Sequence, residues 1–163
     1  MIGGSVVSNT GPLVALAVID QLDLLKQLFD TVLVPEAVHF ELLEGGIAQT
    51  GVAAYKQAQW ITVKELTTPR EPLLDSVLDI GEASVIQLAR ENNINRVLID
   101  ERKGRKIARE IYKLQVIGSA RILIEAKRYG HLDNVKNSLT TMQKHGYWLH
   151  ENIVAAILKE AGE

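Results

Sequence analysis

Cysteine is absent from this sequence of 163 residues. Its absence excludes disulfide bonds, thiolate metal sites and a cysteine nucleophile, and it fits a reducing compartment. Long hydrophobic runs are also missing, and the run from Leu13 to Ile19 is far too short to cross a bilayer. The N-terminus carries no basic segment, so we expect no signal peptide. Together these absences predict a cytoplasmic protein with no membrane segment.

Aromatic residues are scarce, at 5% of the sequence, so the stacking of bases on an aromatic surface is not favoured. Hydrophobic residues make up 47% and charged residues 23%, which is the balance of one globular domain of this length. No linker, repeat or low-complexity tract divides the chain. We therefore predict a single domain over residues 1–163.

Charge is unevenly distributed, although the net charge is only −2. Residues 90–128 include 11 basic and 5 acidic residues, a net charge of +6, so the rest of the chain carries −8. Such a basic segment indicates a polyanionic partner nearby. Solvated helix faces with ordinary ion pairs would give the same pattern, and the sequence leaves both interpretations open.

Short β-branched runs alternate with longer helical patterns, which predicts a mainly parallel sheet covered by helices on both faces. Strands are expected at residues 5–8, 31–34, 61–63, 97–99 and 115–118. Helices are expected from Pro12, at 22–28, from Pro35 to Gly45 and Gly46, and at 53–58, 79–91, 103–112, 120–128, 132–143 and 152–161, with a loop at 67–72. The predicted fold class is therefore α/β in three layers, with four to five strands.

Polar side chains follow two of these strands. Asn9 comes after the first strand, and Asp100 and Glu101 come after the strand at 97–99. Binding sites of open α/β sheets form at such carboxyl ends of strands. Two helix starts supply further candidates, Glu41 and Glu82.

Each candidate also has a structural interpretation. On a helix from Pro35, Glu41 falls in the apolar sector, where a carboxylate requires an ion pair or a bound metal. Glu82 lies three residues after Asp79, which is the spacing of a capping box. Asp100 has the position of an N-cap for the helix that follows it.

Several carboxylates that converge on one point repel one another, and a hard divalent cation relieves this repulsion. Water bound to such a cation loses a proton more easily and can attack phosphorus in line. This chemistry requires no protein nucleophile, which suits a chain without cysteine.

Four segments have an order and spacing that are together fairly specific: VVSNTGPL at residues 6–13, PEAVHFEL at 35–42, DIGEA at 79–83 and LIDERKGR at 98–105. They resemble a PIN-domain family of small prokaryotic proteins, similar to the VapC-type toxin ribonucleases. The resemblance covers nearly the whole chain. It implies a three-layer α/β/α PIN-like fold and a metal-dependent endoribonuclease that is the toxin of a toxin–antitoxin pair.

The resemblance also implies site residues. Mg²⁺ or Mn²⁺ would be bound at Asn9, Glu41, Glu82 and Asp100, with Glu101 as an outer ligand, and Glu41, Glu82 and Asp100 would be catalytic. Position 9 departs from the pattern, because PIN nucleases usually have aspartate there. An amide oxygen can coordinate a hard cation but brings no charge, so we expect weaker metal affinity and reduced or absent catalysis.

Basic residues directly follow the fourth acidic position. Arg102, Lys103 and Arg105 are expected to bind RNA phosphates beside the metal, or an arginine among them orients the carboxylates instead. We expect Arg102 or Arg105 to be internal and the lysines to be solvated. The resemblance further implies an antitoxin protein as a partner and a homodimer. We expect Trp60, Tyr147 and Trp148 to lie in the core or in a dimer interface rather than to form a binding surface.

Two other functions remain open. A catalytically weak PIN fold that only binds RNA or a protein is favoured by Asn9. A nucleotide-binding α/β protein is disfavoured, because the sequence has no glycine-rich phosphate loop.

Overall fold

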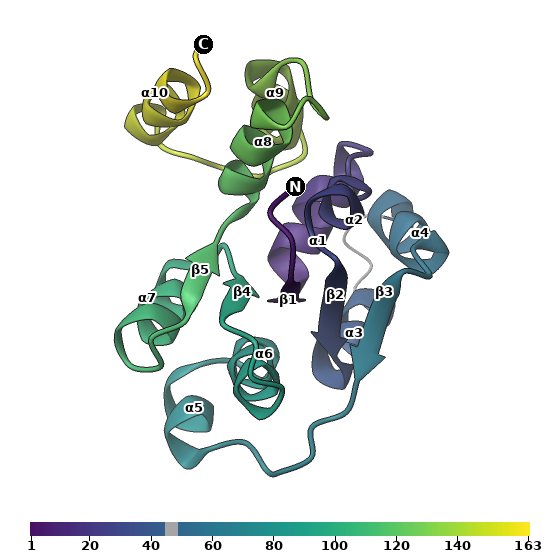
Figure 1. Ribbon diagram of the computed structural model, residues 1–163, viewed down its shortest axis with the longest axis vertical. Coiled ribbons are helices and arrows are strands. Elements are labelled where there is room, and N and C mark those ends of the chain that lie inside the picture. Colours follow the sequence, from purple (N-terminus) through teal and green to yellow (C-terminus); the bar gives the residue numbers. More distant parts are fainter. Residues whose placement is uncertain (45–48) are drawn as a thin grey trace.

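The computed structural model, described for residues 1–44 and 49–163, has a central sheet covered by helices (Figure 1). The five strands have the order β3-β2-β1-β4-β5, and all neighbours are parallel. Their bounds are β1 (Ser5–Ser8), β2 (Thr31–Pro35), β3 (Ile61–Lys64), β4 (Arg96–Leu98) and β5 (Gln115–Ile117). The predicted fold class is confirmed, and each strand bound agrees with its prediction to within one residue.

Burial along the strands explains this agreement. In a parallel sheet with helices on both faces, a strand is apolar throughout rather than at alternate positions. Val6 and Val7 of β1 and Val34 of β2 are fully buried. β3 differs, because it lies at the edge of the sheet and buries only Ile61.

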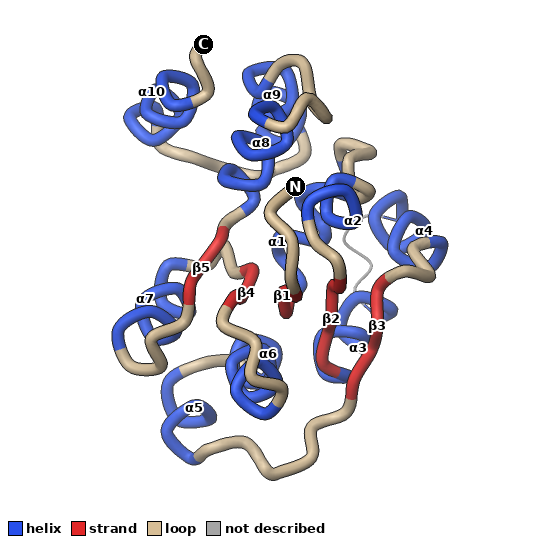
Figure 2. The backbone as a smooth tube through the Cα atoms, in the orientation of Figure 1, coloured by secondary structure: helices blue, strands red, loops and turns tan. Residues whose placement is uncertain are grey.

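Helices account for most of the remaining described chain (Figure 2). They are α1 (Thr10–Val18), α2 (Leu24–Leu28), α3 (Glu36–Glu44), α4 (Gln49–Gln57), α5 (Pro72–Val77), α6 (Ile80–Glu91), α7 (Arg102–Glu110), α8 (Ser119–Arg128), α9 (Val135–Lys144) and α10 (Glu151–Glu160). α6 packs against β1, β2 and β4, and it also contacts α3, α5 and α7. It is therefore the helix that connects the elements around the carboxyl ends of the strands.

Two helix predictions need comment. The short helix α5 was not predicted, because the prolines at positions 69 and 72 were interpreted as a loop. Pro72 instead occupies the first turn of α5, where its missing N–H has no cost, and Leu74 is fully buried. The predicted end of α3 at Gly45 and Gly46 lies outside the described residues.

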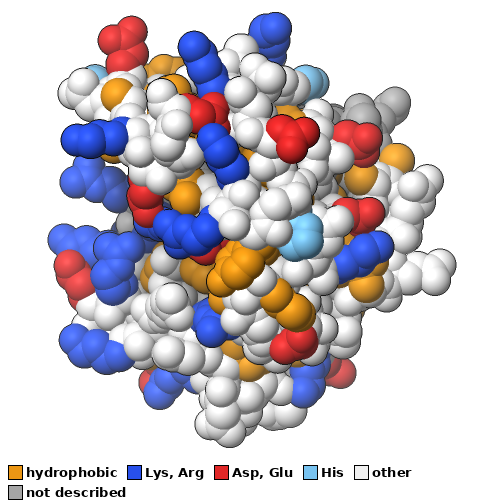
Figure 3. Space-filling model, turned by 45° about the horizontal axis from the view of Figure 1, so that its top comes forward, with side chains coloured by type: hydrophobic (Ala, Val, Ile, Leu, Met, Phe, Trp, Pro, Cys, Tyr) orange, Lys and Arg blue, Asp and Glu red, His pale blue; other side chains and the backbone are white. Residues whose placement is uncertain are grey.

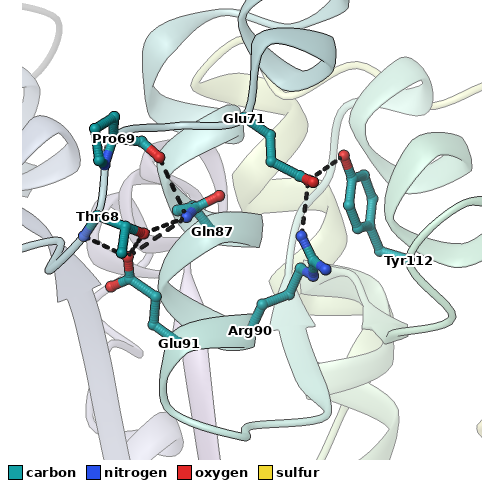
Figure 4. A network of polar contacts seen from close by, with 7 residues as sticks. All are labelled: Thr68, Pro69, Glu71, Gln87, Arg90, Glu91 and Tyr112. Atoms are coloured by element: carbon teal, nitrogen blue, oxygen red, sulfur yellow. Dashed lines mark hydrogen bonds and ion pairs between the residues drawn. The ribbon is translucent and has the colours of Figure 1, made fainter.

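The loop between β3 and α5 is fixed to α6 by the carboxylate of Glu91 (Figure 4). Glu91 accepts hydrogen bonds from the backbone N–H groups of Thr67 and Thr68, both at 2.9 Å, and from the Thr68 hydroxyl. Although burial acts to raise the pKa of Glu91, the bonds from Thr68, Thr67 and Gln87 lower it to about 2. A charged group thus fixes this loop to α6, in addition to the packing of Leu66 against the core.

A second carboxylate, Glu71, fixes the end of the same loop. It accepts hydrogen bonds from Arg90 Nη1 at 2.7 Å and from the Tyr112 hydroxyl at 2.8 Å (Figure 4). The Arg90 guanidinium lies 4.9 Å from the centre of the Tyr112 ring. Burial and the bond to Glu71 raise the pKa of Tyr112 to about 12.

Candidate metal centre

The sheet order brings two chain segments together at one point of its carboxyl edge. The chain runs from β1 to β2 and β3 on one side of β1, and then to β4 and β5 on the other. Ligands of open α/β sheets bind at such a change of direction. Asn9 follows β1 and Asp100 follows β4, and the Asn9 N–H donates to the carbonyl of Leu98 at 2.9 Å.

Three side-chain oxygens surround Gly81 in the first turn of α6. A Cβ atom at this position would lie 3.0 Å from Glu41 Oε2, 3.2 Å from Asn9 Oδ1 and 3.4 Å from Asp79 Oδ1. These oxygens come from α3, from the N-cap of α1 and from the N-cap of α6. They share one small space that the missing side chain of Gly81 leaves open, and we refer to Asn9, Glu41 and Asp79 as the Gly81 group.

Glu41 is solvent-exposed, so its predicted place in the apolar sector of α3 is wrong. α3 buries only Val38 and Leu42 among its residues, so its apolar stripe is narrower than the sequence indicated. Glu41 lies beside this stripe, and α3 packs against α6. None of the ion pairs between described residues includes Glu41, so the alternative of a lysine or arginine partner has no support.

Asp79 is the site residue that the sequence analysis missed. Its Oδ1 accepts a hydrogen bond from the Glu82 N–H at 2.8 Å, which confirms Asp79 as the N-cap of α6. The capping interpretation accounted for Asp79 so well that no further role was considered. The available signal was the neighbouring Gly81, which leaves room for other side chains beside the cap.

Glu82 does not complete the capping box with its side chain but is buried beneath α7. Only 4% of its surface is exposed, and its Oε2 lies 2.9 Å from the place that a Cβ on Gly104 would take. Burial, then the charge and hydrogen bond of Asp79 and the charge of Glu101, raise its pKa to about 7, whereas Lys103 acts to lower it. Carboxylates crowded in this way are stabilised in their charged form by a bound cation.

Asp100 caps a different helix from the one that the sequence indicated. Its Oδ1 accepts a hydrogen bond from the Ser119 N–H at 2.7 Å, and its Oδ2 accepts one from the Ser119 hydroxyl. These bonds serve the N-terminus of α8, where Gly118 is the N-cap and has no side chain to contribute. The predicted cap on α7 is wrong, since Glu101 holds that position without a side-chain bond.

Arg105 is the internal arginine among the basic residues of α7. Its Nη1 donates to the carbonyl of Ile99 at 2.8 Å, whereas Arg102, Lys103 and Lys106 are exposed. Burial and then Arg109 lower the pKa of Arg105, and Asp100 opposes this change. The expectation of one internal arginine and solvated lysines is therefore confirmed.

The donor set of the Gly81 group determines which metal it could hold. Among the described residues, no three His, Cys, Asp or Glu side chains are arranged to hold a metal ion. The Gly81 group has two carboxylates and an amide, and all three are hard oxygen donors of the kind that Mg²⁺ and Mn²⁺ prefer. Beside Asn9, the buried Thr10 hydroxyl has no hydrogen-bond partner among the described residues. The donors therefore fit a hard divalent cation, with one negative charge fewer than three carboxylates would supply.

A family model described as a PIN domain matches residues 5–163. The chain belongs to a PIN domain family. PIN domains are generally nucleases and are typically metal-dependent, and the oxygen donors of this PIN domain lie at the carboxyl edge of its parallel sheet. No curated protein and no solved structure matches the chain. Within the described ranges, none of its helices has the length and hydrophobicity that crossing a membrane requires.

Proposed function

We propose that this PIN domain is a Mg²⁺- or Mn²⁺-dependent endoribonuclease, and that it is the toxin of a toxin–antitoxin pair. The observation that carries the proposal is the meeting of Asn9, Glu41 and Asp79 around Gly81, although these residues are far apart in the sequence. The toxin role is supported by the resemblance of four sequence segments to VapC-type proteins. An antitoxin, a homodimer and a cytoplasmic location belong to the same proposal.

The reaction is the addition of water to an RNA phosphodiester, in which the water oxygen bonds to phosphorus and one P–O ester bond breaks. A bound divalent cation supplies charge stabilisation at the phosphate and makes water easier to deprotonate. Asn9, Glu41 and Asp79 hold the cation. Glu82 lies close to Asp79 and to Glu101, and the negative charge of these carboxylates favours cation binding.

The residues around Asp100 position the neighbouring elements. Asp100 joins the end of β4 to α8 through Ser119, while Arg105 closes the turn after β4 through Ile99. We propose Asp100 as a further ligand in the RNA complex. Arg102 and Lys103, at the exposed start of α7, bind the phosphate that is cleaved.

Calorimetry with Mn²⁺ tests the metal site without any need for activity. We expect a site of roughly millimolar affinity or better that Glu41→Gln weakens at least about tenfold, because a neutral amide replaces a charged ligand. Asn9→Asp should strengthen binding and increase cleavage of a single-stranded RNA. Glu44→Gln, an exposed change on the same helix, serves as the control. Absence of Mn²⁺ binding in the wild type would overturn the proposal.

The second candidate is a PIN fold that binds RNA without cleaving it, and the neutral Asn9 favours it. Measurements on the Asn9→Asp variant distinguish the two functions. If this variant binds Mn²⁺ and cleaves RNA while the wild type binds RNA but does neither, the binding function is the correct one.

A further inference from the structure

Helix α7 carries a concentration of unpaired positive charge. Five of its nine residues are basic: Arg102, Lys103, Arg105, Lys106 and Arg109. None of them takes part in an ion pair between described residues. The only acid of α7 is Glu110, in its last turn.

This arrangement is unfavourable for the helix itself. Arg102 and Lys103 lie in the first turn, where the helix dipole disfavours positive charge, and that turn contains no acid. Arg102 with Lys106 and Arg105 with Arg109 are like charges four residues apart, and such pairs destabilise a helix by about 0.2–0.5 kcal/mol each. Asp100 acts favourably on Arg105, and Lys103 lies near the carboxylate of Glu82. Arg102, Lys106 and Arg109 have no ion-pair partner between described residues. A polyanion bound to α7 would offset the cost that remains.

A cleft of about 700 Å³ lies beside α7 and provides space for such a ligand. One wall consists of Arg102, Lys106 and Arg109 on α7. The opposite wall is mainly apolar and comes from α8, α10 and the segment before α10, with Ile124, Tyr147, Leu149, Ile153 and Ile157. We refer to this space as the α7–α10 cleft. Figure 3 shows Lys and Arg side chains gathered along the left edge of the molecule, on the side where α7 lies in Figure 1.

The α7–α10 cleft reaches the carboxyl edge of the sheet, the edge on which the Gly81 group also lies. Asp100 and Gly118 line it at the carboxyl ends of β4 and β5. A Cβ on Gly118 would lie 3.1 Å from Asp100 Oδ1 and 2.7 Å from Arg105 Nη1. The side chains of Asp100 and Arg105 therefore pack directly against Gly118 at the floor of the cleft. A polymer that is cut at the metal centre can therefore extend into this cleft.

We propose that the α7–α10 cleft binds single-stranded RNA next to the scissile phosphate, an inference that rests on the proposed nuclease function. Lys106 and Arg109 bind phosphates, and the bases contact the apolar wall at Leu149 and Ile153. Only unpaired bases can reach such a wall, because a duplex turns its bases inward. Arg102 and Arg109 are about 10 Å apart along the helix axis, so the cations of α7 can contact more than one phosphate of the strand.

A second, smaller cleft, of about 400 Å³, lies between the start of α3 and the loop that follows β3, and its charged lining residues are Glu36, Glu65 and Arg70. Arg70 is already paired with Asp75 at 2.6 Å. This cleft does not attract a phosphate backbone, so we expect the RNA to bind on the α7 side alone. We expect affinity to rise when an oligonucleotide is lengthened on one side of its cleavage site and to change little on the other.

Fluorescence anisotropy with labelled oligonucleotides in EDTA tests the proposal independently of cleavage. The double variant Lys106→Gln/Arg109→Gln is compared with Lys136→Gln/Lys144→Gln, which removes the same charge from exposed positions of α9. We expect the α7 variant to bind single-stranded RNA about 10–100 times more weakly, with a slope of log affinity against log salt smaller by about 1.4. The α9 variant should remain within about twofold of the wild type.

Three results would overturn the proposal: equal losses in both variants, a duplex bound as tightly as the single strand, or stronger binding of a peptide of alternating leucine and glutamate that displaces the RNA. The last result would assign the cleft to an acidic protein segment.

Two further outcomes separate this proposal from the nuclease function. If the α7 variant loses RNA binding but the wild type cleaves no RNA with Mn²⁺, the nuclease function is wrong and RNA binding in the cleft is supported. If the wild type cleaves RNA and the α7 variant binds it normally, only the cleft proposal fails.

Discussion

Helices α7 and α8 follow neighbouring strands at the same edge of the sheet, yet they differ in whether their basic side chains form ion pairs. On α8, Arg121 pairs with Glu125 and Glu160, and Arg128 also pairs with Glu125. Lys127 pairs with Glu163. The cations of α7 have no such partners between described residues. Ordinary ion pairs are therefore confirmed for α8, whereas a polyanionic partner of α7 stays a prediction.

The two helices also differ in how they are anchored. α8 buries five residues, including Ile122, Leu123 and Ile124, whereas α7 buries only Gly104 and Ala108. α8 is thus stabilised by apolar packing and ion pairs. α7 packs against the protein through small residues, and its basic side chains have no ion-pair partner between described residues.

Truncation of a core side chain on each helix should give the largest effect and the clearest contrast. Leu123 is fully buried, so Leu123→Ala should lower the free energy of unfolding by about 2–5 kcal/mol. Ile107, on α7, is only partly buried, and Ile107→Ala should cost about 1 kcal/mol. Urea unfolding followed by circular dichroism measures both values. Equal costs would mean that α7 is anchored as α8 is.

Gly104→Ala tests the close approach of α7 to the metal centre. The added Cβ would lie 2.9 Å from Glu82 Oε2 and 3.2 Å from Ile99 Cγ2, so we expect a loss of about 1–2 kcal/mol in spite of the better helix propensity. Gly11→Ala is the control, since nothing lies within 4 Å of its new Cβ. This control should gain up to about 1 kcal/mol. A gain at both positions in thermal unfolding would contradict the packing of Glu82 beneath α7.

Lowering the pH should weaken the contacts that anchor α8 and not those of α7. Glu163 accepts hydrogen bonds from Lys127 Nζ at 2.9 Å and from the N–H groups of Val135 and Lys136 at 2.8 and 3.1 Å. The bond from Lys127, with the two backbone bonds, lowers the pKa of Glu163 below its usual 4.5, against the effect of burial. Its contribution is therefore complete above pH 4.5 and is lost as the pH falls below that value.

Glu163→Gln should accordingly cost about 1 kcal/mol at pH 7. The difference from the wild type should shrink as the pH is lowered from about 5 to 3. Urea unfolding at a series of pH values measures this difference. Glu110→Gln on α7 is the control, and it should show no comparable dependence on pH. A difference for Glu163→Gln that stays constant with pH would mean that its charge is not what stabilises α9.

Charge reversal should give the smallest effects, with opposite signs on the two helices. Lys106→Glu places an acid three or four residues from Arg102, Lys103 and Arg109, so we expect a gain of about 0.3 kcal/mol. Arg121→Glu leaves Glu125 and Glu160 facing a like charge, and we expect a loss of up to about 1 kcal/mol. Matched thermal unfolding curves at low salt resolve these changes. Equal signs would remove the proposed distinction between the helices.

The sequence predicted the sheet more completely than the site. Strands of a covered parallel sheet are short runs of apolar β-branched residues, and this local signal sets their positions. The short helix α5 was missed, because its stability comes from the burial of Leu74 rather than from a periodic pattern. The placement of Asn9 at the end of β1 was likewise a local inference and is confirmed.

The directions of side chains could not be obtained in the same way. Asp79 meets Glu41 and Asn9 only because α3 and α6 pack together. Asp100 caps α8, although it precedes α7 in the chain. Trp148, expected in the core or in a dimer interface, is 78% exposed in the single chain. Each of these outcomes depends on contacts between distant segments, which no local spacing encodes.

The exposure of Trp148 has a practical consequence for optical work on this protein. It lies between Tyr147 and Leu149, which both line the α7–α10 cleft, and its ring meets that of His150 edge-on at 6.2 Å. Trp60 is the only other tryptophan of the chain. A Trp60→Phe variant would therefore have a single tryptophan, adjacent in sequence to two residues of the cleft wall, and its quenching by iodide would report occupancy without an attached dye.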